Sequence, residues 1–261
     1  MSGRVVTEVS DGIGTIVLDH RERRNALTVE MWEALPGAAA ELAGDDAVRV
    51  VVVRGAGEVA FASGADISEF ETTRSSAELN HGYDRLVGTA TGSLSRIPKP
   101  VVAAVHGFCL GGGLAVALGC DLRIVADDAS FAIPAARLGV GYNAPGVRTL
   151  LQLVGPSATK RLLFTAARIP AAEALHIGLV DEVVPKASLD EHVAALAATM
   201  ADNAPLTQQA VKVAVRELLR PEADRDQAAI DEAITACFDS EDFAEGVRAF
   251  LGKRRPRFTG R

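Results

Sequence analysis

The sequence predicts a mixed α/β fold whose second half is a layer of helices. Three observations predict it. Short apolar runs with the spacing of buried strands alternate with helical segments in the first half, and from about residue 144 the pattern changes to successive amphipathic helices. In addition, 48% of the 261 residues are hydrophobic, so the chain can bury a substantial core as one large domain or as a domain with a helical appendage.

The first half begins with a βαβ-like unit. Residues 5–9, 14–19 and 48–54 have the pattern of strands, and residues 28–42 have helical spacing, with Thr28 as the expected N-cap. Beyond this unit the same criteria predict a buried strand at 101–105, a short apolar helix at 112–118, and strands at 122–125 and 130–133.

The second half is predicted to be helical apart from a brief strand at 181–184. Pro156 and Pro170 directly precede the first two helices, where proline is well tolerated. The predicted helices are 157–165, 171–177, 189–202, 205–219, 223–238 and 242–251. A helical layer of this kind suits subunit contact.

Charge and cysteine usage exclude several classes of protein. The net charge of −7 argues against a nucleic-acid-binding or anionic-membrane surface, because both need a broad basic face. Cys109, Cys120 and Cys237 are odd in number and lack CxxC spacing, which argues against a disulfide framework and a zinc site. The first residues contain no unbroken apolar stretch, so we expect a cytoplasmic protein without a secretory signal.

Residues 101–120 contain no Asp, Glu, Lys or Arg and are long enough to be scored as a membrane span. We reject that interpretation because glycines interrupt the segment, Pro100 precedes it and charged residues follow it at once. The pattern is better suited to a strand, a turn and a buried helix.

Two glycine-bearing segments about 45 residues apart carry the strongest functional signal. They are 61–67 (FASGADI) and 106–114 (HGFCLGGGL), each downstream of a strand-like apolar run. Small residues at both places allow two backbone N–H groups to converge on one acyl oxygen, and a helix starting at Gly112 would direct its positive end to the same point. The glycine triplet alone is explained equally well by close helix packing. The two segments together favour an oxyanion hole.

Other glycine motifs are weaker. Residues 55–60 match the G-x-G-x-x-A form of a dinucleotide-binding fingerprint, but that fingerprint must open a helix, and here FASGA follows at once. No GK[ST] or HExxH sequence is present. Nicotinamide, nucleoside-triphosphate and metal chemistry are therefore not expected.

At these residues the chain resembles the crotonase (enoyl-CoA hydratase/isomerase) superfamily over nearly its whole length. The matching segments are Asn25-Ala26-Leu27, 61–69, Lys99-Pro100, 105–121, Leu138-Gly139, 171–174 with 178–180, and Phe250 with Lys253-Arg254. The resemblance implies a spiral core of ββα repeats over residues 1–200 and a C-terminal helical trimerisation and CoA-clamp region over 201–261. It also implies a homotrimer or a hexamer built as a dimer of trimers.

The resemblance further implies a substrate and a site. The substrate is an acyl-CoA thioester, so coenzyme A belongs to the substrate and no separate cofactor is expected. The backbone N–H groups of Ala65 and Gly112 would polarise the thioester carbonyl. The expected CoA contacts are Arg24 and Ala26 along the CoA path, Ser63, Gly64, Asp66 and Ile67 around the adenine and pantetheine bend, and Phe250 and Lys253, which commonly reach a CoA in a neighbouring subunit. On composition alone, the basic run 253–257 is a solvated tail.

The chain departs from the family at the two acid/base positions. Hydratases of the family carry glutamates where this chain has Ala115 and Ala135, and alanine cannot transfer a proton. Tyr83 and Tyr142, the only tyrosines, fall in pocket-lining segments and are candidates for proton transfer, although two ordinary half-buried tyrosines are an equal alternative. Asp66 is expected to fix its own turn, and Glu69 and Glu71 to face solvent or begin the next helix.

Two hypotheses of different class follow. The first is an enzyme that stabilises a thioester enolate through Ala65 and Gly112, with proton transfer by Tyr142, Tyr83 or water. The second is a non-catalytic acyl-CoA-binding protein. We favour the enzyme, because a binding protein has less need of both donors. A dinucleotide-dependent oxidoreductase using residues 55–60 is a weaker third.

Overall fold

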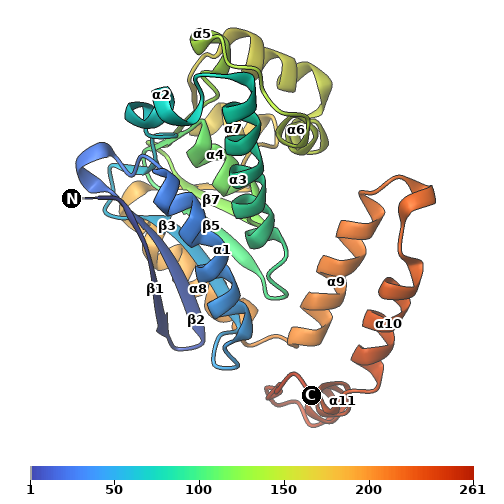
Figure 1. The fold of residues 1–261 in the computed structure, drawn as a ribbon. Coiled ribbons are helices and arrows are strands. Elements are labelled where there is room, and N and C mark those ends of the chain that lie inside the picture. The colour runs from blue at the N-terminus through green and yellow to red at the C-terminus, as the bar shows by residue number, and fades with distance from the viewer. Residues whose placement is uncertain (1) are drawn as a thin grey trace.

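A six-stranded sheet forms the centre of the fold in the computed structural model, which describes residues 2–261 (Figure 1). The first two strands of the chain form an antiparallel pair at one edge, and every other neighbouring pair in the sheet is parallel. The strands, in spatial order, are β1 (Arg4–Ser10), β2 (Ile13–Asp19), β3 (Val50–Gly55), β5 (Val101–Val105), β7 (Leu122–Ala126) and β10 (Glu182–Val184). The inner strands are covered on both faces, which explains their continuous apolar sequences.

A second, four-stranded sheet is built from much shorter strands. They are β4 (Ala60–Ala62), β6 (Phe108–Leu110), β8 (Ser130–Ala132) and β9 (Ile169–Pro170). Along the chain, β3 leads into β4, β5 into β6 and β7 into β8, and each pair is followed by helix. The ββα repetition that the resemblance implies is therefore present.

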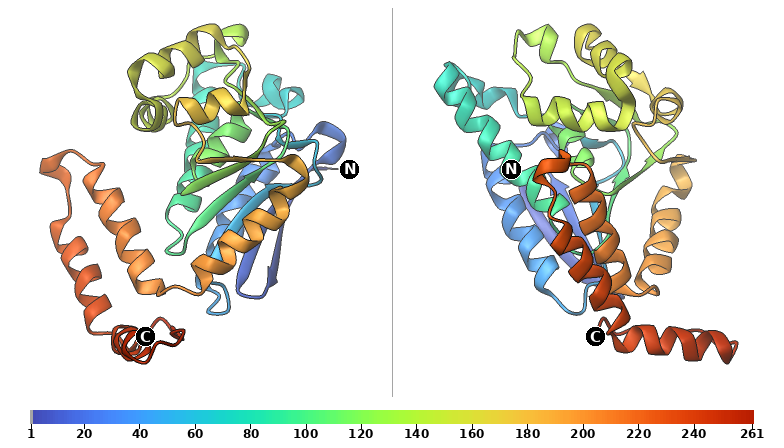
Figure 2. Two further views of the ribbon diagram at one scale, coloured as in Figure 1. Left: turned by 180° about the vertical axis from the view of Figure 1, so that it is seen from behind. Right: turned by 90° about the vertical axis from the view of Figure 1, so that its right-hand side faces the viewer.

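Helices cover both faces of the six-stranded sheet (Figures 1 and 2). Alternate residues of β3 point to opposite sides: Val50 and Val52 pack against α8, whereas Val51 and Val53 belong to the larger core cluster that includes α1. The helices of this part are α1 (Val29–Gly44), α2 (Phe70–Thr73), α3 (Ala77–Ser95), α4 (Gly112–Leu118), α5 (Ala135–Leu138), α6 (Ala144–Thr165), α7 (Ala171–His176) and α8 (Leu189–Ala201).

The capping of α1 follows the prediction. Thr28 has extended backbone angles, and its hydroxyl accepts a hydrogen bond from the Met31 amide at 3.3 Å. The buried face of this helix includes Met31 and Trp32 and, four and three residues later, Leu35. Trp32 thereby enters the core next to the cavity described below.

Local signals missed several short elements. The strands β4, β6 and β9, helix α5 and the first half of α6 were not predicted. No bounds were predicted for α2 or for the longer helix α3, and α10 begins at Gln227 rather than at residue 223. Three-residue strands carry no recognisable period, because their hydrogen bonds go to partners distant in sequence. Helix α6 was predicted only after Pro156, where the chain bends at Gly155 with a φ of 72°.

The rejected membrane span is divided among β5, β6 and α4. Within residues 2–261, no helix combines the length and the apolar character needed to cross a membrane. Residues 55–60 lead from β3 into β4 and do not open a helix, in contrast to a dinucleotide-binding loop.

Three helices at the C-terminus extend away from the sheets (Figures 1 and 2). They are α9 (Pro205–Leu218), α10 (Gln227–Phe238) and α11 (Glu241–Leu251), and α9 packs against α10. Large apolar side chains on them are exposed, including Phe238, Phe250 and Leu251. Several large apolar side chains exposed on neighbouring helices usually mark a contact with another chain. The division at residue 200 remains a prediction.

Glu217 closes the connection between α9 and α10 and makes stability depend on pH. Its carboxylate accepts the Asp226 amide at 3.1 Å and is paired with Arg220 at 2.7 Å and Arg216 at 3.1 Å. The backbone hydrogen bond from Asp226, followed by the arginine contacts, lowers the pKa of Glu217 from 4.5 to about 2. A carboxyl with a depressed pKa stabilises the fold above its unfolded-state pKa, and this contribution is lost as pH falls through the folded-state value.

We therefore expect Glu217→Gln to lower the melting temperature at neutral pH, and the deficit relative to wild type to disappear as pH falls from 4.5 to about 2. Thermal unfolding monitored by circular dichroism across this range measures it. Glu232→Gln, an exposed carboxylate change on α10, is the control and should show no such trend. A Glu217→Gln deficit that stays constant with pH would contradict the assignment.

Candidate active site

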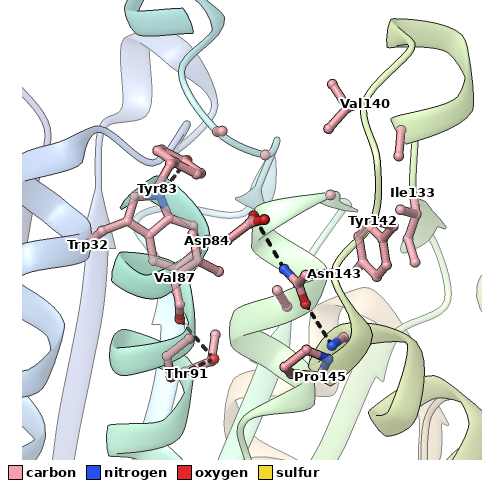
Figure 3. Close-up of a pocket in the computed structure, with 18 of the residues that line it drawn as sticks. Trp32, Tyr83, Asp84, Val87, Thr91, Ile133, Val140, Tyr142, Asn143 and Pro145 are labelled. Carbon is pink, nitrogen blue, oxygen red and sulfur yellow. Dashed lines mark hydrogen bonds between the residues drawn. The ribbon is translucent and has the colours of Figure 1, made fainter. Parts of the chain in front are cut away.

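A cavity of about 380 Å³ lies between α3, α4, the turn at residues 63–67 and the segment that leads into α6 (Figure 3). It brings together residues predicted from separate parts of the sequence. The predicted site residues that line it are Ser63, Gly64, Ala65, Ile67, Tyr83, Gly112, Ala115, Ala135 and Tyr142.

The amides of Ala65 and Gly112 face each other across a short gap. A Cβ atom placed on Gly112 would lie only 3.3 Å from the Ala65 nitrogen. Within residues 2–261, neither amide donates a hydrogen bond to a protein acceptor. Their neighbours are occupied, since the Asp66 amide donates to Leu27 at 2.9 Å and the Gly111 amide donates to Ala132 at 2.8 Å. The turn at residues 63–67 and the start of α4 therefore leave two adjacent N–H donors available to a ligand.

The glycine triplet serves both purposes that the sequence left open. At Gly113 a Cβ would lie 2.3 Å from the Ala62 carbonyl oxygen, so this glycine permits close packing of α4. Gly111 has a φ of 49°, a conformation that other residues rarely adopt. At Gly112 a Cβ would lie 2.9 Å from the Trp32 ring and would intrude between the two free amides.

The two tyrosines occupy different environments. The Tyr83 hydroxyl oxygen accepts a hydrogen bond from the buried Trp32 Nε1 at 2.8 Å, and the Arg74 guanidinium lies 4.5 Å from its ring centre. Within residues 2–261, the Tyr142 hydroxyl has no hydrogen-bond partner. Burial raises the pKa of both tyrosines to about 12, and the charge of Asp84 adds to this effect at Tyr142. Both phenols therefore remain protonated at neutral pH and can act as donors.

The difference between the tyrosines predicts different costs of losing the hydroxyl. Tyr83→Phe leaves the Trp32 N–H buried without an acceptor and is expected to lower the free energy of unfolding by about 1–3 kcal/mol. Tyr142→Phe breaks no protein hydrogen bond, and we expect a change below about 1 kcal/mol. Urea unfolding of the two variants compares them directly. Equal losses would show that the Trp32 contact contributes nothing to stability.

The carboxylates nearest in sequence to the two free amides do not line the cavity. Asp66 fixes its turn as predicted, accepting the Ser68 amide at 3.0 Å. Glu69 begins the next helix, one of the two placements expected for it: it is the N-cap residue of α2, it is half-buried, and its carboxylate accepts the Val29 amide at the start of α1 at 2.9 Å. Glu71 is exposed in the first turn of α2, as expected. Ala115 and Ala135 line the cavity and supply no ionisable group.

Sequence reasoning missed Asp84, which lines the cavity from α3. Its carboxylate lies 3.6 Å from Arg74 and accepts the Asn143 side-chain amide at 3.4 Å. The signal was available only in part, because Asp84 adjoins Tyr83. Without the bounds of α3, nothing in the sequence shows which side of the helix faces the glycine turns.

The remaining predicted CoA contacts lie outside the cavity lining. Arg24 is exposed, and its guanidinium lies 5.2 Å from the Phe108 ring centre. Ala26 and Asp66 are buried and do not line the cavity. Phe250, 84% exposed, and the exposed Lys253 belong to α11 and the turn after it, at the opposite end of the molecule from α6 (Figures 1 and 2). Within one chain, these two residues do not reach the cavity.

Comparisons with known proteins agree over almost the entire chain. The family model described as enoyl-CoA hydratase/isomerase matches residues 8–261. The short-chain-enoyl-CoA hydratase of Clostridium acetobutylicum is 34% identical over 255 residues, which cover 96% of this chain and 95% of that protein. The crotonyl-CoA hydratase of Syntrophomonas wolfei is 33% identical over 254 residues, which cover 97% of this chain and 97% of that protein.

Solved structures show the same similarity in three dimensions. An enoyl-CoA hydratase/carnithine racemase from Magnetospirillum magneticum superposes with a TM-score of 0.94 at 36% identity, covering 98% of this chain and 96% of that one. A putative enoyl-CoA hydratase/isomerase family protein from Hyphomonas neptunium gives a TM-score of 0.93 at 37% identity, with 98% of both chains covered.

Proposed function

Since the chain belongs to the enoyl-CoA hydratase/isomerase family, we propose that this acyl-CoA-processing enzyme holds the thioester carbonyl oxygen between the backbone N–H groups of Ala65 and Gly112. The reaction class is formation and use of a thioester enolate. The observation that carries the proposal is the pair of adjacent amides that open into the cavity without a protein acceptor.

The energetic argument rests on where negative charge develops. When an enolate forms, the carbonyl oxygen gains charge, and two fixed donors interact more strongly with it than with the neutral carbonyl. Loss of one such donor typically costs about 2.7–4 kcal/mol of transition-state stabilisation. Gly64, with a φ of 114°, and Gly111, with a φ of 49°, hold the two loops in conformations that expose these donors.

Hydration, double-bond isomerisation and C–C bond cleavage all pass through such an enolate. The relatives from C. acetobutylicum and S. wolfei are named as hydratases, which supports a substrate with a thioester and an adjacent double bond. We propose that Ala115 and Ala135 replace the pair of glutamates that family hydratases use. Hydration by two glutamates is then not the mechanism here. The proposed chemistry needs no separate cofactor.

We also propose that the active form is a homotrimer or a dimer of trimers. The exposed apolar side chains of α9–α11, among them Phe238, Phe250 and Leu251, support subunit contact. Phe250 and Lys253 could then contact a CoA bound in a neighbouring subunit. Size-exclusion chromatography coupled to light scattering gives the molar mass. A monomer at micromolar concentration would contradict this assignment.

A substrate panel tests the proposed function. Purified protein is incubated with enoyl-, β-hydroxyacyl- and malonyl-type CoA esters, products are followed by mass spectrometry, and binding is measured by calorimetry. Isotope-edited infrared spectroscopy of the bound thioester reports carbonyl polarisation. We expect binding, a downshifted carbonyl band and turnover of at least one class. If CoA esters bind and their carbonyl is polarised but no ester is turned over, the result favours the non-catalytic alternative. If no ester binds, the proposal is overturned.

A further inference from the structure

Asp84 is the single carboxylate among the described residues that line the cavity, and we propose that it is the catalytic acid/base of this site. The inference rests on the proposed function and names the group that moves the proton. The other ionisable side chains lining the cavity are Arg74, Tyr83 and Tyr142. Arginine remains a cation and the buried phenols remain protonated at neutral pH, so none of the three can accept a proton.

Three donors hold the Asp84 carboxylate in place. The Asn80 side-chain amide, one turn earlier on α3, donates to Oδ2 at 3.1 Å, and the Arg74 guanidinium lies 3.6 Å from Oδ1. Across the cavity, the Asn143 side-chain amide donates to Oδ1 at 3.4 Å. The side chain remains 23% exposed, so it is reachable from the cavity.

The orientation of Asn143 is determined by a second contact. Its Oδ1 accepts the Gly146 amide at 2.9 Å and caps α6, which requires its Nδ2 to face Asp84 (Figure 3). The cap of one helix thus positions the carboxylate of another. Asn143 is a positioning residue in this scheme, and it acts only through Asp84.

The proposed step balances without any co-reactant. Asp84 takes a proton from the carbon next to the thioester carbonyl, and the C–H electron pair forms the C=C bond of the enolate. The carbonyl π electrons move to oxygen, where the Ala65 and Gly112 amides face the negative charge. The protonated Asp84 then returns its proton to the α carbon or to a carbon further along a conjugated chain. The first outcome is exchange when the proton on the solvent-accessible Asp84 carboxyl has been replaced from solvent before it is returned, and the second is isomerisation.

Exchange of the α protons of a saturated acyl-CoA tests this step without knowledge of the physiological reaction. Butyryl-CoA is incubated with enzyme in deuterated buffer, and deuterium at the α carbon is measured by mass spectrometry. Asp84→Asn keeps the size of the side chain but removes the base, and we expect its exchange rate to fall by about 100-fold or more. Glu78→Gln, an exposed carboxylate change on the same helix, is the matched control and should exchange like wild type.

The outcomes separate this inference from the proposed function. Exchange at the wild-type rate in Asp84→Asn overturns the role of Asp84, as does a wild-type enzyme that polarises the carbonyl without exchanging; in both cases the proposed oxyanion hole stands. A wild-type enzyme that neither binds nor polarises butyryl-CoA overturns the proposed function, and this inference falls with it. Loss of exchange with binding and polarisation retained supports Asp84.

A second variant keeps the test decisive if Asp84→Asn does not fold. Asn143→Asp preserves the helix cap but places a second carboxylate beside Asp84. The charged and titratable groups facing Asp84 in the cavity lining are otherwise Arg74, Tyr83 and Tyr142. Repulsion between two adjacent carboxylates disfavours the state in which both are ionised, so the pH midpoint of exchange should move upward. A merely structural link between α3 and α6 predicts an unchanged midpoint, and that result overturns the proposal.

Discussion

Gly112→Pro is expected to lower kcat for acyl-CoA turnover by about 10²–10³-fold, because it deletes one of the two N–H groups that we propose bind the thioester oxygen. Proline suits the first position of α4, where the amide has no helical acceptor, so the helix itself can still form. The bound thioester should lose its infrared downshift. Steady-state kinetics and isotope-edited infrared spectroscopy measure the two effects.

The matched control for this change is Gly112→Ala. Both substitutions add a Cβ atom, which would lie 2.9 Å from the Trp32 ring, but alanine keeps the N–H group. We expect the alanine variant to lose stability through this contact and to retain the carbonyl downshift. Equal loss of polarisation in both variants would assign the effect to steric displacement and would remove the support for the oxyanion hole.

Ala115→Glu together with Ala135→Glu is expected to raise crotonyl-CoA hydration by about 10²–10⁴-fold, the usual contribution of general acid/base catalysis. Both alanines line the cavity, so the introduced carboxylates would face it from α4 and α5. Each single variant restores only one of the two groups and should gain far less. Loss of the enoyl thioester absorbance measures the rate.

The control for the double change pairs Ala115→Glu with Ala136→Glu. Ala136 is the exposed neighbour of Ala135, so the second carboxylate is then placed in solvent. We expect no gain in hydration beyond that of Ala115→Glu alone. An equal gain in both double variants, or no gain in a correctly folded Ala115→Glu/Ala135→Glu enzyme that binds crotonyl-CoA, would contradict the assignment of the two positions. The second result would indicate that Tyr142 occupies the space that the attacking water needs.

Much of the fold was predictable because its signals are local. The strands at 101–105 and 122–125, the helix at 112–118 and the N-cap at Thr28 all appear close to their predicted positions. Each depends on the apolar period of a short segment or on one side chain bonding to a backbone group three residues away. The glycine segments and the resemblance also predict that the Ala65 and Gly112 amides converge, and the two residues do lie side by side in the structure.

The group of polar side chains around Asp84 could not be predicted in the same way. Asp84, Asn143 and Arg74 meet only because α3, the start of α6 and the segment after α2 converge on one cavity. The carboxylates nearest in sequence to the glycine turn do not line the cavity, and that of Glu69 binds the Val29 amide.

The amino-acid sequence thus determined many of the longer elements, the two glycine turns and the absence of carboxylates at positions 115 and 135. The tertiary structure alone decided which carboxylate faces the cavity and how it is held. The physical reason is range: helix periods, caps and glycine turns are set by contacts within a few residues, whereas the Asp84–Asn143 hydrogen bond joins residues 59 positions apart.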